Sequence, residues 1–389
     1  MHKFLTVTSL FVLLVALVGC ERVQKVVVPE TVVAPEPINT VKIGFLASGS
    51  RVTYPNGAQI AVSEINRNGG LLGMPVSLVT EVGILTPDAA VAAASKMIFD
   101  DGIVALLGPN RSAQAIPIGP LVQEHRLPMI TTTATNPALT ETSDFMFMAS
   151  FTDEYQGAMI ARFAREELGL TSVAVLTQSG EIYTEGLSEF FITSFTDAGG
   201  RIVASEFYEI KDTDFTDHLN TIAAMNPEAL FIAGWVTELV HIIQQARDFP
   251  LRNAVGEPTL LLGTDTWDNP ILLNNEDVEI DGCFFTGHFF HASDRPSVKA
   301  FVETYQEAYK ELPFGGHAVS YDAAKVLFEA IERAGSFDGE AIRAQLAATE
   351  NYIGPTTIAN YNEKRHPTKS VVIFTIKDGE KQFYKQIDP

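Results

Sequence analysis

Short runs of β-branched and apolar residues alternate with amphipathic stretches along the chain from Val41 onward. A run of about four to eight such residues is typical of a buried strand, and apolar residues spaced three and four apart are typical of a helix. The runs predict strands at 41–46, 76–81, 104–108, 129–132, 172–177, 201–208, 229–233, 259–263, 356–360, 371–376 and 382–387. The amphipathic stretches predict helices at 57–68, 87–101, 113–124, 153–168, 182–198, 214–225, 237–248, 296–311, 318–334 and 339–348.

The alternation of strands and helices runs to residue 132 and starts again at residue 153. This order predicts an α/β fold of two doubly wound lobes, each built on a parallel sheet with helices on both faces. Ligands of such sheets bind beyond the carboxyl ends of the strands. Two facing lobes would therefore enclose a binding cleft.

The start of the chain has the pattern of an export signal. Lys3 precedes an apolar run, Leu10–Val18, which is too short to span a bilayer and is typical of a signal peptide. The run ends in LVGC (17–20), which resembles the bacterial lipobox, where cleavage exposes a cysteine that is then acylated. We predict a lipoprotein signal peptide at 1–19 and lipidation of Cys20. An ordinary secretory signal with a chance cysteine is the alternative.

The segment after the signal peptide indicates a linker. Residues 21–40 carry three prolines among valines and glutamates, with no helical period, so we assign 20–40 to a lipid-anchored linker. At about 3.1 Å per residue, such a segment could hold the folded body roughly 60 Å from the membrane. A first strand through Val26–Val28 is the alternative, which the prolines that follow disfavour.

The net charge of the chain argues against two classes of binding partner. It has 48 acidic residues against 27 lysines and arginines, a formal net charge of −21. This balance argues against nucleic acid and against electrostatic binding to anionic lipid. No segment after the signal peptide is long and apolar enough for a membrane helix, so contact with the membrane would depend on the lipid anchor.

The sequence lacks the motifs of common catalytic sites. It contains no Gly-x-x-x-x-Gly-Lys, Gly-x-Gly-x-x-Gly, Gly-x-Ser-x-Gly or His-Glu-x-x-His. His288 and His291 lie in an extended run, where positions three apart point to opposite faces, so they should not share a metal ion. We therefore expect a binding protein that is not an enzyme and that uses no cofactor or metal.

Eight segments carry a resemblance to a known family. They are 57–79 (GAQIAVSEINRNGGLLGMPVSLV), 104–124, 128–140 (PMITTTATNPALT), 211–222, 227–238 (PEALFIAGWVTE), 261–267 (LLGTDTW), 320–335 and 353–364. Together they resemble the type I periplasmic solute-binding proteins of ABC transporters, in particular the branched-chain (Leu/Ile/Val) amino-acid group. The segments occur in the family's order from Val41 to the C-terminus, which is far more specific than any single motif.

The resemblance implies the division into lobes. In this family the chain crosses between the lobes three times, and we place the crossings near Ser150, Cys283 and Thr368. The first lobe would then contain 41–151 and 284–367, and the second 152–283 and 368–389. The lobes would close around a ligand by hinge motion.

The resemblance also implies an anion site on the first lobe. The family presents a serine hydroxyl and helix N-terminal amides to the ligand's α-carboxylate, at positions that are Ser112 and Ala113 here. Because Ser112 precedes the predicted helix, its hydroxyl and the following N–H groups suit an anion, although simple N-capping would also explain a serine. The family uses the carbonyl at Thr133 for the ammonium group, and the hydroxyl and amide at Thr135 for the carboxylate.

The second lobe would complete the recognition of a zwitterion. Asp265 stands where the family places the acid that pairs with the ammonium group, although an acid at a strand end is often a helix cap. Tyr183 and Trp235 match aromatic positions in the cleft, with core packing as the alternative. Tyr54 is assigned as a side-chain contact, in a first loop (47–56) that is shorter than usual in the family.

The resemblance implies an extracytoplasmic receptor, anchored to the membrane by lipid. It would bind an amino acid, branched-chain or otherwise apolar, act as a monomer, and deliver the ligand to an ABC permease. Arg111, beside the anion site, could instead favour a ligand with an additional carboxylate. A receptor for another small solute, such as an aromatic carboxylate or an amide, and a regulatory lipoprotein without a transport role are the alternatives.

Overall fold

The computed structural model describes residues 40–49 and 51–388. The predicted signal peptide, the lipidation site Cys20 and nearly all of the predicted linker lie outside these residues. Within the described part of the chain, no helix combines the length and apolar character needed to cross a membrane.

The first sheet has five strands, all parallel, in the order β2-β1-β3-β4-β5. Four of the five were predicted from the sequence. The fifth, β5, is only three residues long and was missed. The bounds are β1 Val41–Ser48, β2 Val76–Ile84, β3 Ala105–Leu107, β4 Met129–Thr131 and β5 Met146–Met148.

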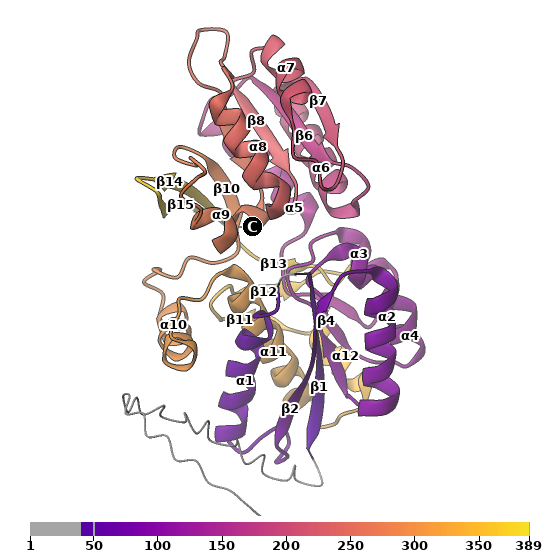
Figure 1. Ribbon diagram of the computed structural model, residues 1–389. Helices are drawn as coiled ribbons and strands as arrows, with labels where there is room; N and C mark the ends of the chain where they lie inside the picture. Colours follow the sequence, from indigo (N-terminus) through magenta and orange to yellow (C-terminus); the bar gives the residue numbers. More distant parts are fainter. Residues whose placement is uncertain (1–39, 50, 389) are drawn as a thin grey trace, which may run out of the picture. The chain divides into compact units, whose positions relative to one another are not determined.

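Helices cover both faces of this sheet (Figure 1). Ile43 and Phe45 of β1 pack in one apolar cluster with α1, α11 and α12, whereas Leu46 packs in another with α2 to α4. The alternation along β1 is the expected period of two. The bounds are α1 Pro55–Arg67, α2 Pro87–Lys96, α3 Ser112–Ala115, α4 Gly119–Glu124, α11 Gly315–Ala334 and α12 Gly339–Ala347.

The second sheet has seven strands in the order β15-β14-β10-β9-β8-β6-β7. The strands from β6 to β9 are mutually parallel, as predicted. The strand β10, which was not predicted, runs parallel to β9, whereas β14 runs antiparallel to both β10 and β15. The chain returns to this sheet at its C-terminal end as a hairpin, which accounts for the antiparallel pairing of β14 with β15. The bounds are β6 Ser172–Gln178, β7 Arg201–Tyr208, β8 Ala229–Ala233, β9 Leu260–Gly263, β10 Phe284–Gly287, β14 Val371–Lys377 and β15 Glu380–Ile387.

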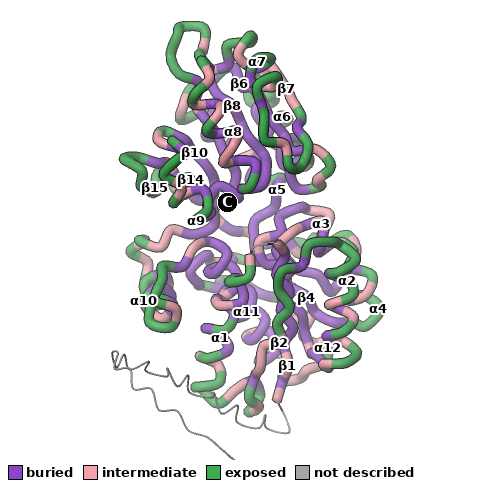
Figure 2. The backbone as a smooth tube through the Cα atoms, viewed as in Figure 1, coloured by how far each residue is buried: buried purple, intermediate pink, exposed green. Residues whose placement is uncertain are grey.

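Helices also cover both faces of the second sheet. Val173 and Val175 of β6 pack in a cluster with α5 and α6, and Ala174 and Leu176 in a cluster with α7 and α8. Figure 2 shows the central strands buried and the outward turns of these helices exposed. The bounds are α5 Asp153–Glu166, α6 Ile182–Asp197, α7 Thr216–Ala224 and α8 Val236–Asp248.

The remaining elements are short, except for one helix that packs on α1 and α11. A third, three-stranded antiparallel sheet joins β11, β12 and β13. The bounds are α9 Pro270–Leu273, α10 Pro296–Tyr309, β11 Glu350–Tyr352, β12 Ile358–Tyr361, β13 Pro367–Thr368, the π-helix η1 Met97–Asp101, and the 3₁₀ helices η2 Ile116–Ile118, η3 Pro137–Glu141 and η4 Asp265–Trp267.

Three segments lead from one large sheet and its helices to the other. They follow β5, β10 and β13. The boundary predicted at Cys283 was too early, because Phe284–Gly287 pairs with β9 and β14 and thus belongs to the second sheet. The extended pattern of this strand gave no hint of its partners, which lie far away in the sequence.

The helix predicted at 113–124 is interrupted. It consists of α3, the 3₁₀ turn η2 and α4, with Pro117 and Pro120 in the first turns of the last two. Proline has no N–H group for a helical hydrogen bond, which accounts for the break. Ser112 is therefore the first residue of a four-residue helix rather than the cap of a long one.

Candidate functional site

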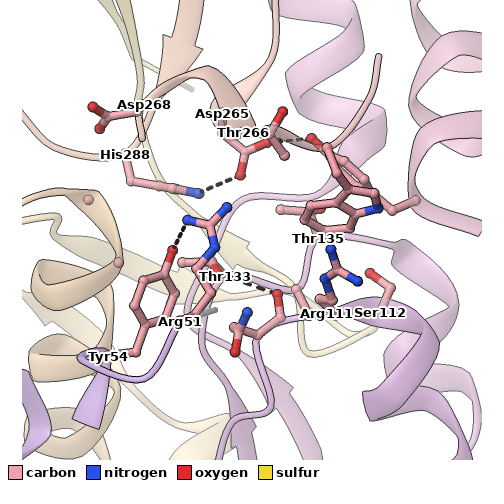
Figure 3. Close-up of a pocket in the computed structure, with 16 residues that line it drawn as sticks. Arg51, Tyr54, Arg111, Ser112, Thr133, Thr135, Asp265, Thr266, Asp268 and His288 are labelled. Carbon is pink, nitrogen blue, oxygen red and sulfur yellow. Dashed lines mark hydrogen bonds and ion pairs between the residues drawn. The ribbon is translucent and has the colours of Figure 1, made fainter. Parts of the chain in front are cut away.

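A pocket lies where loops from the two large sheets meet (Figure 3). Arg51, Ser112 and Thr133 follow β1, β3 and β4 of the first sheet. Asp265 and His288 follow β9 and β10 of the second. All five come after the carboxyl ends of parallel strands, where this class of sheet binds its ligands. The lining residues are Arg51, Tyr54, Asn110, Arg111, Ser112, Thr133, Ala134, Thr135, Tyr183, Trp235, Asp265, Thr266, Asp268, His288, Gly315 and Gly316.

The structure brings most of the predicted site residues together in this pocket. The seven that line it are Tyr54, Ser112, Thr133, Thr135, Tyr183, Trp235 and Asp265. Ala113, the eighth, belongs to α3 but is not among the lining residues. The sequence therefore predicted the location of the pocket from both sheets, while the part that each residue plays toward a ligand stays a prediction.

The first sheet contributes hydroxyl groups. Ser112 is 2% exposed, and its Oγ accepts a hydrogen bond from the backbone N–H of Asn136 at 3.2 Å. The N-cap position of α3 belongs to Arg111 and not to Ser112, and the O–H of Ser112 remains able to donate to a ligand. Thr135 is 1% exposed, and its Oγ1 makes no hydrogen bond within 3.5 Å in the described structure, although the buried carboxyl group of Asp153 lies beside it. A buried hydroxyl without a partner is costly, so a ligand acceptor at this point would stabilise the pocket.

The second sheet contributes a largely buried carboxylate, 9% exposed, that three side chains hold in place. Oδ1 of Asp265 accepts hydrogen bonds from Tyr183 Oη at 2.7 Å and from Gln156 Nε2 at 2.9 Å. Oδ2 lies 3.3 Å from His288 Nε2. A carboxylate has about four lone-pair sites. Three neighbours therefore fix the orientation of this one and leave capacity for a further donor.

The neighbours of Asp265 do not neutralise its charge. Burial lowers the pKa of His288, so its imidazole is neutral at pH 7 and donates through Nε2–H. The ring stacks on Phe151, with centroids 4.0 Å apart, which fixes its orientation. Burial raises the pKa of Tyr183 well above its usual value, so the phenol keeps its proton and donates as well. The carboxylate is thus hydrogen-bonded while still able to pair with a cation.

Two arginines line the same pocket. The guanidinium of Arg111 lies over the ring of Trp235, with Cζ 3.7 Å from the ring centroid, and Nη1 of Arg51 donates to Tyr54 Oη at 2.6 Å. Burial lowers the pKa of Arg111, and the field of Glu181 opposes that shift, but an arginine stays protonated in proteins. Within residues 40–49 and 51–388, no carboxylate lies within 4.0 Å of either guanidinium.

Tyr54 is held in the pocket by the start of α11. A Cβ atom on Gly316 would come within 2.1 Å of Cζ of Tyr54, so only glycine permits this packing. The ring is 3% exposed and lies 5.6 Å from that of Phe314. The Gly-Gly pair at 315–316 thus explains how the first loop reaches the pocket.

Sequence reasoning missed three charged or titratable residues of the pocket. Arg51 was overlooked in the short loop that contains Tyr54. His288 was considered only as a metal ligand, and Asp268 was not considered. Oδ1 of Asp268 pairs with Lys381, and its Oδ2 is buried without a partner in the described structure. All three follow the carboxyl end of a strand, which is the signal that could have revealed them.

The arrangement combines hydroxyl donors on one side with a carboxylate on the other. It can therefore bind a small molecule that carries both an anionic and a cationic group. Among the described residues, no group of three or more His, Cys, Asp or Glu side chains is placed to hold a metal ion.

The sequence matches the family described as periplasmic binding protein over residues 40–381. This match covers the pocket and both large sheets except for most of the edge strand β15. The chain belongs to the periplasmic binding protein family. Members of this family are extracytoplasmic solute receptors.

The relatives of this periplasmic binding protein place it in the type I, branched-chain amino-acid group. A Leu/Ile/Val-binding protein of Rhizobium johnstonii is 28% identical over 329 residues, which are 80% of this chain and 85% of the relative. A leucine-specific-binding protein of Salmonella typhimurium is 26% identical over 72% of this chain and 74% of its own length.

Solved structures agree with this placement. The leucine-binding protein LivK of Thermotoga maritima is 34% identical, with a TM-score of 0.81 over 90% of this chain and 99% of that one. A benzoate-bound solute-binding protein of Rhodopseudomonas palustris is 20% identical, with a TM-score of 0.78 over 90% of this chain and 97% of its own. The second similarity, at this identity, establishes the fold alone.

Proposed function

We propose that this periplasmic binding protein is a lipid-anchored receptor that binds an amino acid between its two lobes and delivers it to an ABC permease. The lobes would be those predicted from the sequence, with the second crossing moved past Gly287. We propose that it acts as a monomer, with the hinge at the three crossings. Relatives with Leu/Ile/Val or leucine in their names support a substrate with an α-ammonium and an α-carboxylate group.

The observation that carries this proposal is the position of Asp265 opposite Ser112 and Thr135 in one pocket (Figure 3). The α-ammonium group would pair with the free capacity of Asp265, and the α-carboxylate would accept from the hydroxyls of Ser112 and Thr135. Charge-assisted hydrogen bonds contribute roughly 1.5–3 kcal/mol each. Both ends of a zwitterion could therefore be held by protein groups.

The residues that join the two sheets around the ligand support a receptor that closes. Arg111 follows β3 of the first sheet and stacks on Trp235, which follows β8 of the second. Nδ2 of Asn136, from the first, donates to the carbonyl oxygen of Ile182, in the second, at 3.0 Å. A bound ligand would add its own contacts to both sides, which is how a hinged receptor gains affinity on closure.

The test is binding of amino acids by wild type and Asp265→Ala, measured by calorimetry after co-purified ligand has been removed. Asp265→Ala leaves a buried ammonium group unpaired and should cost roughly 2–5 kcal/mol of binding free energy. Asp294→Ala is the matched control, because the Asp294 side chain is fully exposed and pairs only with the exposed Lys299. Equal affinity of wild type and Asp265→Ala would contradict the proposal.

A second comparison tests the need for the ammonium group directly. Wild type should bind an amino acid at least about tenfold more tightly than the α-keto acid of the same side chain. A thermal-shift screen should include benzoate and simple amides. If benzoate or an amide stabilises the protein more than every amino acid does, the ligand is another small solute and not an amino acid. Failure of all small molecules to stabilise the protein would point to a regulatory role.

A further inference from the structure

The pocket offers an apolar side chain aromatic rings and no large aliphatic side chain. None of the sixteen lining residues is Leu, Ile, Val, Met or Phe. Its apolar surface comes from Ala134 and from the rings of Tyr54, Tyr183 and Trp235, one of which is already covered by the Arg111 guanidinium. Burying a branched aliphatic chain is favourable only against apolar groups, and burying polar groups without partners opposes it.

The two arginines lie at different ends of the pocket. In Figure 3, Arg111 lies beside Ser112, and Arg51 lies on the opposite side next to Tyr54 and His288. Arg111 is thus close to the proposed position of the α-carboxylate, and the neighbouring Glu181 offsets part of its charge. Arg51 has no comparable acid at ion-pair distance among the described residues, and its Nη1 bonds only the neutral Tyr54 hydroxyl.

A bound zwitterion would leave the charge of Arg51 uncompensated. The ligand's ammonium group would occupy Asp265, and its α-carboxylate would occupy the hydroxyl groups on the other side. Asp268 is not available as a full counter-charge, because it already pairs with Lys381. A guanidinium in a closed, low-dielectric pocket needs an anionic partner, and its planar fork matches a carboxylate.

We propose that the ligand is an acidic amino acid, whose side-chain carboxylate binds Arg51. This inference rests on the proposed function, since it assumes that the amino-acid end lies between Asp265 and the hydroxyls. Tyr54 contributes to the same subsite: its oxygen accepts from Arg51, and its O–H is left to donate to the side-chain carboxylate. Arg51 is thus the residue that determines specificity.

The unpartnered Oδ2 of Asp268 makes it possible to distinguish an acidic ligand from its amide. It lies at the same end, 3.3 Å from where a Cβ on Gly315 would be. A side-chain amide could donate to this oxygen, whereas a carboxylate could not. Comparing the affinity for L-glutamate with that for L-glutamine, and for L-aspartate with that for L-asparagine, therefore distinguishes recognition by Arg51 from recognition by Asp268.

The experiment is calorimetry on the detergent-solubilised mature protein with these four amino acids and L-leucine. One acidic amino acid should bind at least about tenfold more tightly than its own amide and than leucine. Arg51→Met should weaken the acid at least about tenfold and the amide far less, and Arg51→Lys should restore part of the preference. Arg67→Met, at an exposed position of α1, is the matched control and should change nothing.

The outcomes separate this inference from the proposed function. Tighter binding of leucine or of an amide than of both acids would overturn it while leaving amino-acid binding intact. Equal losses for acid and amide in Arg51→Met would also overturn it. If no amino acid binds wild type, the proposed function fails and this inference with it. The preference of the wild type decides the matter even if Arg51→Met does not fold.

Discussion

The hydroxyl of Tyr183 donates a hydrogen bond to Oδ1 of Asp265 over 2.7 Å. Tyr183 lies in the first turn of α6 and Asp265 begins η4 after β9, so the bond joins two helix starts beyond the carboxyl ends of strands of the second sheet. The ring of Tyr183 is itself packed against Trp235, with centroids 5.1 Å apart. The carboxylate is thus oriented before a ligand arrives, and such preorganisation lowers the entropic cost of binding.

Replacing Tyr183 with Phe should weaken ligand binding while leaving the fold intact. The ring and its packing remain, but Asp265 loses one of three hydrogen bonds that hold its orientation. We expect a loss of roughly 1–2 kcal/mol in binding free energy, measured by calorimetry. Tyr155→Phe is the control, because the Tyr155 hydroxyl has no partner in the described structure. Equal effects of the two variants would contradict an orienting role.

The site could be predicted only in part, for a physical reason. Ser112, Thr135 and Asp265 were found because the resemblance assigned them a role and each follows a strand. Arg51 and His288 follow strands too, but what they do depends on neighbours distant in sequence. His288 faces Asp265 only because β10 lies beside β9, and sequence periodicity carries no information about which strands pair.

A buried lysine ties two of the three crossings together. Nζ of Lys369, just after β13, donates to the carbonyl oxygen of Ala149 at 2.6 Å and to Thr356 Oγ1 at 2.8 Å. Ala149 follows β5, in the first crossing. The Thr356 hydroxyl in turn donates to the buried carboxylate of Asp322. Burial lowers the pKa of Lys369 to about 8, and the nearby charge of Asp322 opposes that shift.

Lys369→Met should destabilise the protein, because it leaves the Ala149 carbonyl unpaired and removes the cation that most favours the charged form of Asp322. We expect a loss of roughly 1–3 kcal/mol in the free energy of unfolding, measured by urea denaturation. Adding Asp322→Asn to Lys369→Met should recover part of this loss if the charge of Asp322 is its main cause. No loss in Lys369→Met, or no recovery in the double variant, would contradict this account.

The pH dependence of stability should contain a contribution from His317. Its Nε2 lies 3.2 Å from Tyr305 Oη and 3.1 Å from Thr53 Oγ1, and burial lowers its pKa to about 3. Between about pH 6.5 and 3 the unfolded chain therefore binds a proton that the folded chain does not. The contribution is fully present above pH 6.5 and is lost as the pH falls toward 3, by up to about 1.4 kcal/mol per unit.

Chemical denaturation of wild type and His317→Gln between pH 7 and pH 4 measures this contribution. Wild type should lose stability relative to the variant as the pH falls. Burial also lowers the pKa of His288, His291 and His366, which add losses of the same sign to both proteins and cancel in the comparison. A stability difference that stays constant across this range would contradict the assignment to His317.

The fold was predictable wherever a local pattern decides the structure. The strand at 229–233 has the bounds predicted from its run of apolar residues, and β7 likewise. The strand β5 was missed because three residues, Met-Phe-Met, form no period. The antiparallel direction of β14 was missed because it is set by hydrogen bonds to β10. The two strands are nearly ninety residues apart in the sequence, and a local pattern of apolar residues carries no information about such a pairing.

The remaining prediction concerns the tether rather than the pocket. We propose that Cys20 carries the lipid and that the linker lets the receptor move near its permease. At least two acyl chains are needed for stable anchoring, since each buried methylene contributes about 0.8 kcal/mol.

Cys20→Ala should therefore move the protein from the membrane fraction to the soluble fraction, as fractionation and immunoblotting would show. Because the pocket is built only from residues after Val41, its affinity for an amino acid should be unchanged. Retention of Cys20→Ala on the membrane, or weaker binding by the released protein, would contradict this division between anchor and receptor.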